Sequence, residues 1–73
     1  MNYDVNALIK ASNEKAINAF KARVLENAKL TKQAWAEGRN EYARMSADII
    51  CAEHYSTFGA DVEELKRFVI EAY

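Results

Sequence analysis

The chain has 73 residues, of which 51% are hydrophobic, and it carries a formal net charge of −1 at pH 7. This length predicts a single domain, residues 1–73, which buries only about 60% of its unfolded surface. The one cysteine, Cys51, excludes an intramolecular disulfide, and Cys51 and His54 are too few for a four-ligand zinc site. Oligomerisation is therefore the expected source of additional stability.

The composition predicts an all-α fold. The sequence contains no proline and only two glycines, Gly38 and Gly59, while alanine, lysine and glutamate are frequent. Proline and glycine are the strongest interruptions of regular structure, and the three frequent residue types are good helix formers. We therefore expect helices with few breaks.

The first predicted helix covers residues 4–27, approximately. Asp4 suits the N-cap position, where a carboxylate accepts hydrogen bonds from the free amides of the first turn. Apolar residues follow at helical spacing: Val5, Leu8, Ile9, Ala16, Ile17, Phe20, Val24 and Ala28. This pattern is typical of an amphipathic helix.

A tight turn is predicted near residues 27–31. Thr31 can serve as the N-cap of a second helix, which we place at about 32–58. Leu30 and Trp35 then lie on either side of this cap in the hydrophobic-staple arrangement, which fixes the direction in which a chain enters a helix.

The second predicted helix carries apolar or small residues at alternating steps of three and four. They are Trp35, Gly38, Tyr42, Met45, Ile49 and Ala52. This is the spacing of a helix that packs a narrow seam against another helix. A glycine inside a helix costs about 1 kcal/mol relative to alanine, which close contact of two backbones can offset. We expect the first five of these residues to seal a homodimer.

Two alternatives to a turn near residues 27–31 stay open. In one, the turn lies at Gly38-Arg39-Asn40, with Gly38 just past the end of one helix and Asn40 as the cap of the next. In the other there is no turn, because the same spacing extends back from Trp35 to Val24 and describes one helix of roughly 50 residues.

The third predicted helix is short and covers residues of about 62–72. Gly59 suits the left-handed position that ends the preceding helix, and Asp61 with Glu64 forms a capping box. The apolar face of this helix consists of Val62, Leu65, Phe68, Val69 and Ala72. The predicted architecture is a helical hairpin of two long helices plus this short helix, in a dimeric bundle.

Candidate catalytic and metal-binding residues are few. Cys51 and His54 share a helix face with Asp48, but an isolated pair at this spacing is a weak metal signal. Asp48 and Glu53 surround Cys51 with negative charge, which disfavours a reactive thiolate. We expect no catalytic residue, no metal, no cofactor and no enzymatic activity.

Charge is distributed unevenly along the chain. Residues 1–39 contain seven Lys and Arg against four Asp and Glu, a net +3, whereas residues 40–73 contain three against seven, a net −4. Oppositely charged halves that pack together explain this asymmetry most simply. The basic residues are interleaved with glutamates and the isoelectric point is about 5.8, so nucleic acid is an unfavoured partner.

These observations indicate a small helical module that binds another protein as a regulator, inhibitor or assembly adaptor. The alternative is a nucleic-acid-binding regulator that uses the basic N-terminal half. Tyr3, Arg39 and Tyr73 are the candidate partner-binding residues, because aromatic and arginine side chains are enriched in interface hot spots. The residues at the start, MNYDVNALIK, lack the apolar run of a signal peptide, and together with the free thiol they predict a cytoplasmic protein without a membrane anchor.

Overall fold

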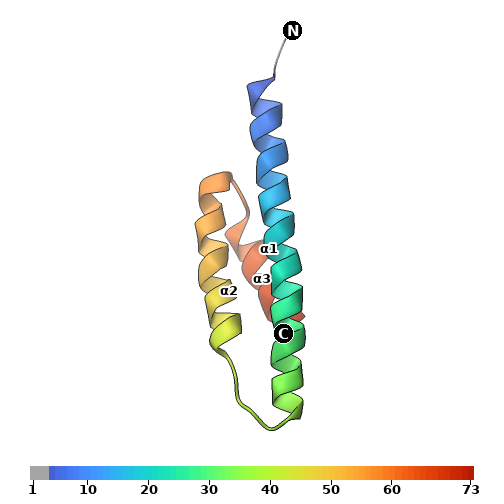
Figure 1. Ribbon diagram of the computed structural model, residues 1–73. Helices are drawn as coiled ribbons and strands as arrows, with labels where there is room; N and C mark the ends of the chain where they lie inside the picture. Colours follow the sequence, from blue (N-terminus) through green and yellow to red (C-terminus); the bar gives the residue numbers. More distant parts are fainter. Residues whose placement is uncertain (1–3) are drawn as a thin grey trace.

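The computed structural model describes residues 4–73, apart from the side chain of Phe58, and this part of the chain is helical with no strands. Helix α1 spans Val5–Ala36, α2 spans Ala43–His54 and α3 spans Val62–Ala72, with a short 3-10 helix, η1, at Tyr55–Phe58. Helix α2 runs back beside the C-terminal half of α1, and α3 packs against both (Figure 1). The prediction of an all-α fold with three helices is confirmed for the described residues.

Helix α1 begins where the sequence predicts and ends later. The Ala7 amide donates to Asp4 Oδ1 at 3.2 Å, which confirms Asp4 as the N-cap. The helix then continues through residues 27–31, so the turn predicted there is wrong. The reason is packing: Ala28, Thr31 and Ala34 extend the buried face and keep the chain helical. Thr31 is fully buried inside the helix and caps nothing.

The turn lies at Gly38 instead. Gly38 has φ +83°, its amide donates to the Trp35 carbonyl at 3.0 Å, and the Arg39 amide donates to the Ala34 carbonyl at 2.9 Å. These two bonds form a Schellman motif, in which glycine relieves the steric cost of the left-handed conformation. The alternative with Gly38 at the helix end is therefore correct in position, and the single continuous helix is wrong. Asn40 does not cap the next helix, because α2 begins at Ala43 and Tyr42 occupies its N-cap position.

The second half of the chain follows its local signals more closely. Gly59 has φ +77°, and the Ala60 amide donates to the Tyr55 carbonyl at 3.3 Å, which confirms the predicted stop. Asp61 accepts from the amides of Glu63 and Glu64 and caps α3, as predicted. The second helix, predicted at 32–58, is reduced to α2 and η1, because residues 32–42 belong to α1 and the following loop.

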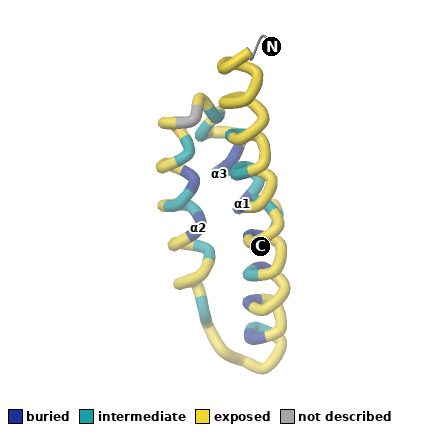
Figure 2. The backbone as a smooth tube through the Cα atoms, turned by 45° about the horizontal axis from the view of Figure 1, so that its top comes forward, coloured by how far each residue is buried: buried dark blue, intermediate teal, exposed yellow. Residues whose placement is uncertain are grey.

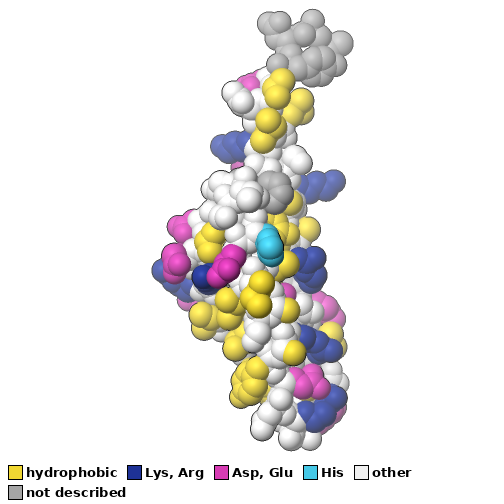
Figure 3. Space-filling model, turned by 90° about the vertical axis from the view of Figure 1, so that its left-hand side faces the viewer, with side chains coloured by type: hydrophobic (Ala, Val, Ile, Leu, Met, Phe, Trp, Pro, Cys, Tyr) yellow, Lys and Arg dark blue, Asp and Glu magenta, His cyan; other side chains and the backbone are white. Residues whose placement is uncertain are grey.

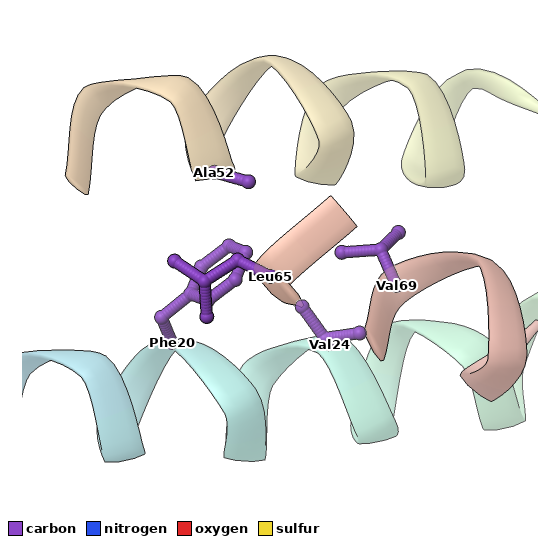
Figure 4. Packing of buried hydrophobic residues seen from close by; sticks show 5 residues of the cluster. All are labelled: Phe20, Val24, Ala52, Leu65 and Val69. Carbon is purple, nitrogen blue, oxygen red and sulfur yellow. The ribbon is translucent and has the colours of Figure 1, made fainter. Parts of the chain in front are cut away.

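The hydrophobic core draws on all three helices. Phe20 and Val24 from α1 meet Ala52 from α2 and Leu65 and Val69 from α3, and all five are buried (Figure 4). Half-buried side chains that include Met45, Ile49 and Tyr55 surround this cluster. This cluster packs α2 and α3 against α1.

The N-terminal part of α1 extends beyond this core. We call residues 5–16 the arm; most of it is exposed, while the buried residues of α1 lie between Phe20 and Ala34 (Figure 2). The described chain measures 58 × 19 × 15 Å because α1, at 32 residues, is far longer than α2, at 12. The first turns of the arm, from Val5 to Ser12, are therefore exposed, while Ala16 at its other end is half-buried.

The Schellman turn predicts the effect of replacing Gly38. We expect Gly38→Ala to lower the free energy of unfolding by about 1 kcal/mol, because a Cβ strains a residue at positive φ. Gly38→Asn should cost less, since asparagine tolerates this conformation better. Urea unfolding of the three chains measures the differences. A gain in stability for Gly38→Ala would place Gly38 inside a helix and contradict the turn.

Candidate interaction site

The five residues of the predicted seam do not share one helix. Trp35 lies in the last turn of α1, Gly38 lies in the loop, and Tyr42 directly precedes α2. Trp35 Nε1 donates to the Glu41 carbonyl at 3.0 Å, and the rings of Trp35 and Tyr42 lie 5.4 Å apart at 46°. This end of the seam closes the loop between α1 and α2.

The other end of the predicted seam faces inward. Met45 and Ile49 are half-buried and pack against the core of their own chain. The expectation of one stripe along a single helix is therefore wrong, because the Gly38 turn divides it and α1 and α3 cover its second half. Self-association through these residues remains a prediction.

The three candidate partner-binding residues also separate. Tyr3 lies outside the described residues. Arg39 is exposed in the loop and pairs with Glu37 at 2.9 Å and Glu41 at 3.3 Å. Tyr73 is half-buried, and its hydroxyl donates to Asp48 Oδ2 at 2.6 Å. Of the two described candidates, Arg39 is the one on an exposed surface.

The bond to Tyr73 belongs to a polar junction that joins all three helices. Asp48 on α2 is only 4% exposed, and the Asn27 side chain on α1 donates to both of its carboxylate oxygens, at 3.2 and 3.1 Å. Thr31 Oγ1 is buried and has no hydrogen-bond partner in the described chain. This junction was not predicted from the sequence, although Asn27 stands between Val24 and Thr31 at core spacing and signals a buried polar residue.

This environment changes the acidity of Tyr73. Partial burial raises the pKa of its hydroxyl above the ordinary 10.0, and the hydrogen bond to Asp48 and the charge of that carboxylate raise it further. The charge of Arg44 favours the phenolate and opposes these effects, but it is outweighed. The protonated hydroxyl is therefore the form that the fold stabilises.

Cys51 and His54 do not form a metal-binding or catalytic site with a third described side chain. Cys51 is half-buried, with Arg23 Nη2 at 3.9 Å from its sulfur, and His54 is exposed. Within residues 4–73 there is no detected pocket and no group of three or more His, Cys, Asp or Glu side chains placed to hold a metal ion.

The arm provides the most continuous exposed apolar surface of α1. Val5, Leu8 and Ile9 are 61%, 59% and 53% exposed and stand at helical spacings of three and one. Val5, Ala16 and Asn27 follow at intervals of 11 residues, about three helical turns, so they share one side of α1. Because Asn27 contacts α2, the stripe on the arm points to the side that α2 occupies further along (Figure 3).

Comparisons of the chain with protein-family models, with curated proteins and with solved structures find no match. Among the described residues, no helix combines the length and the apolar character needed to cross a membrane.

Removal of the Asp48 carboxylate tests the polar junction. We expect Asp48→Ala to lower the free energy of unfolding by about 2 kcal/mol or more, because it leaves the Asn27 amide and the Tyr73 hydroxyl without an acceptor. Glu53→Ala is the matched control on α2; it removes only an exposed ion pair with Lys66, worth less than about 1 kcal/mol. Equal losses in urea unfolding would show that the junction contributes nothing specific.

The raised pKa of Tyr73 predicts a pH dependence of stability. A folded-state pKa above the unfolded value stabilises the fold below the unfolded pKa, and this contribution is lost as pH rises further. We expect the stability advantage of the wild-type chain over Tyr73→Phe to be constant below about pH 9 and to shrink above about pH 10. Urea unfolding between pH 8 and 11 measures it, and the tyrosines common to both chains cancel. A difference independent of pH would contradict the junction.

Proposed function

We propose that this chain is a small helical protein-interaction module that acts by binding another protein, as a regulator, inhibitor or assembly adaptor. The observation that carries the proposal is the arm, three turns of helix whose Val5, Leu8 and Ile9 are uncovered. Apolar side chains at such spacings on one helix are the anchors with which an amphipathic helix binds a groove of its partner.

The energetics support this use of the arm. Full burial of a leucine or isoleucine side chain stabilises a complex by about 1.5–3 kcal/mol. The Asp4 cap and the core around Phe20 hold the arm helical before it binds, so little ordering entropy remains to be lost. Lys10, Glu14 and Lys15 leave residues 5–16 nearly neutral, which suits an apolar groove.

Self-association and a cytoplasmic setting are part of the proposal. A chain of this size gains stability from oligomerisation. Cys51 is a free thiol, which is typical of a reducing compartment.

Binding to nucleic acid is the alternative function, through the basic residues of the N-terminal half. Lys10, Lys21 and Lys32 stand 11 residues apart and therefore share one side of α1, which supports this alternative. The last helix carries Glu63, Glu64 and Glu71, which repel phosphate. Affinity for duplex DNA that falls steeply with salt would favour this alternative over the first.

Capture from a lysate of the native host tests the arm. We expect Leu8→Glu to reduce recovery of the specific partner at least tenfold, because a buried unpaired charge opposes binding. Leu25→Glu is the matched control: Leu25 is the same residue type on the same helix, is 55% exposed, and lies outside the arm.

Arg39→Glu and Trp35→Ala test the loop end of the molecule in the same assay. Partner recovery that depends on these two residues and is indifferent to Leu8→Glu would transfer the binding site from the arm to the loop and contradict the proposal.

A further inference from the structure

We infer that the occupant of the arm is the arm of a second copy of this chain, which runs antiparallel to the first in a two-fold homodimer. This inference rests on the proposed function, in which the arm is a protein-binding helix, and it names the partner.

The position of α2 shows which side of the arm is vacant. Helix α2 lies against the Asn27 side of α1 and ends at His54, and the chain turns away at Gly59. The side of the arm that carries Val5 and Ser12 is exposed and continues this strip toward the N-terminus, and the half-buried Ala16 lies where the cover from the same chain ends. Another helix antiparallel to α1 therefore extends the packing that α2 begins (Figure 1).

The shape of the stripe matches its own antiparallel copy. Large side chains, Val5, Leu8 and Ile9, occupy the N-terminal half of the arm, and small ones, Ser12 and Ala16, occupy the C-terminal half. An antiparallel alignment places Val5 against Ala16 and Ile9 against Ser12 of the second copy. The two-fold axis repeats both contacts with the roles of the two copies exchanged. Large against small fills the interface evenly, and a two-fold axis closes it after two copies.

The charges beside the stripe favour the same arrangement. Asp4 and Lys15 are exposed and stand 11 residues apart, so they lie on one flank of the stripe. Antiparallel pairing brings Asp4 of each copy to the neighbourhood of Lys15 of the other, which gives two complementary pairs. Parallel pairing places this flank of the two copies on opposite sides of the dimer, so it forms neither pair.

The molar mass in solution tests the dimer. By light scattering at roughly 100 µM, we expect the wild-type chain and Leu25→Glu to have twice the mass of 8.3 kDa, and Leu8→Glu to have the single mass with its helical circular dichroism retained. A monomeric wild-type chain overturns the inference, as does a Leu8→Glu chain that remains dimeric or a Leu25→Glu chain that becomes monomeric.

Oxidative cross-linking tests the direction of the arms in a Cys51→Ser background. Ser12→Cys lies near the two-fold axis and should form a disulfide-linked dimer readily, whereas Val5→Cys is placed about 16 Å along the helix from its copy and should not. Preferential cross-linking of Val5→Cys overturns the antiparallel arrangement. A monomeric wild-type chain whose capture of a host protein still depends on Leu8 disproves this inference and leaves the proposed function standing.

Discussion

The carboxylate of Asp48 is the contact on which the arrangement of the helices depends. A buried carboxylate is costly unless hydrogen bonds replace its water, and here the donors come from Asn27 on α1 and Tyr73 at the end of α3. The aliphatic core around Val24 and Leu65 tolerates small shifts along a helix axis, because dispersion and burial are not directional. The hydrogen bonds do not, so they select one alignment of α2 and α3 along α1.

That alignment determines which part of α1 remains uncovered. Asp48 holds α2 opposite Asn27, and a helix of 12 residues cannot then reach the start of α1. The arm is thus a geometric consequence of one long helix packed against two short ones. Val5, Leu8 and Ile9 of the arm are exposed in the monomer, which is why the proposed binding role is assigned to the arm and not to the aromatic pair that closes the loop.

The candidate site was only partly predictable. The apolar residues at the start of the chain were recognised as a helix face, but their exposure was not, because exposure depends on where the other helices end. The spacing from Trp35 to Ala52 suggested one seam, since a three–four pattern in the sequence does not reveal a turn inside it. Tyr73, predicted as a surface contact, is instead bonded to Asp48, an interaction between residues 25 positions apart that local patterns do not report.

The sequence by itself determined the all-α class and those helix ends that local chemistry controls: Asp4, Gly59 and Asp61 act through hydrogen bonds or dihedral angles within a few residues of themselves. Only the tertiary structure decided between Thr31 and Gly38 as the end of α1. Both residues suit a helix terminus locally, but Thr31 stands on the face that the core buries, so packing keeps it helical and moves the turn to the glycine. The same packing, which buries residues of α1 only between Phe20 and Ala34, decided that Val5, Leu8 and Ile9 stay exposed.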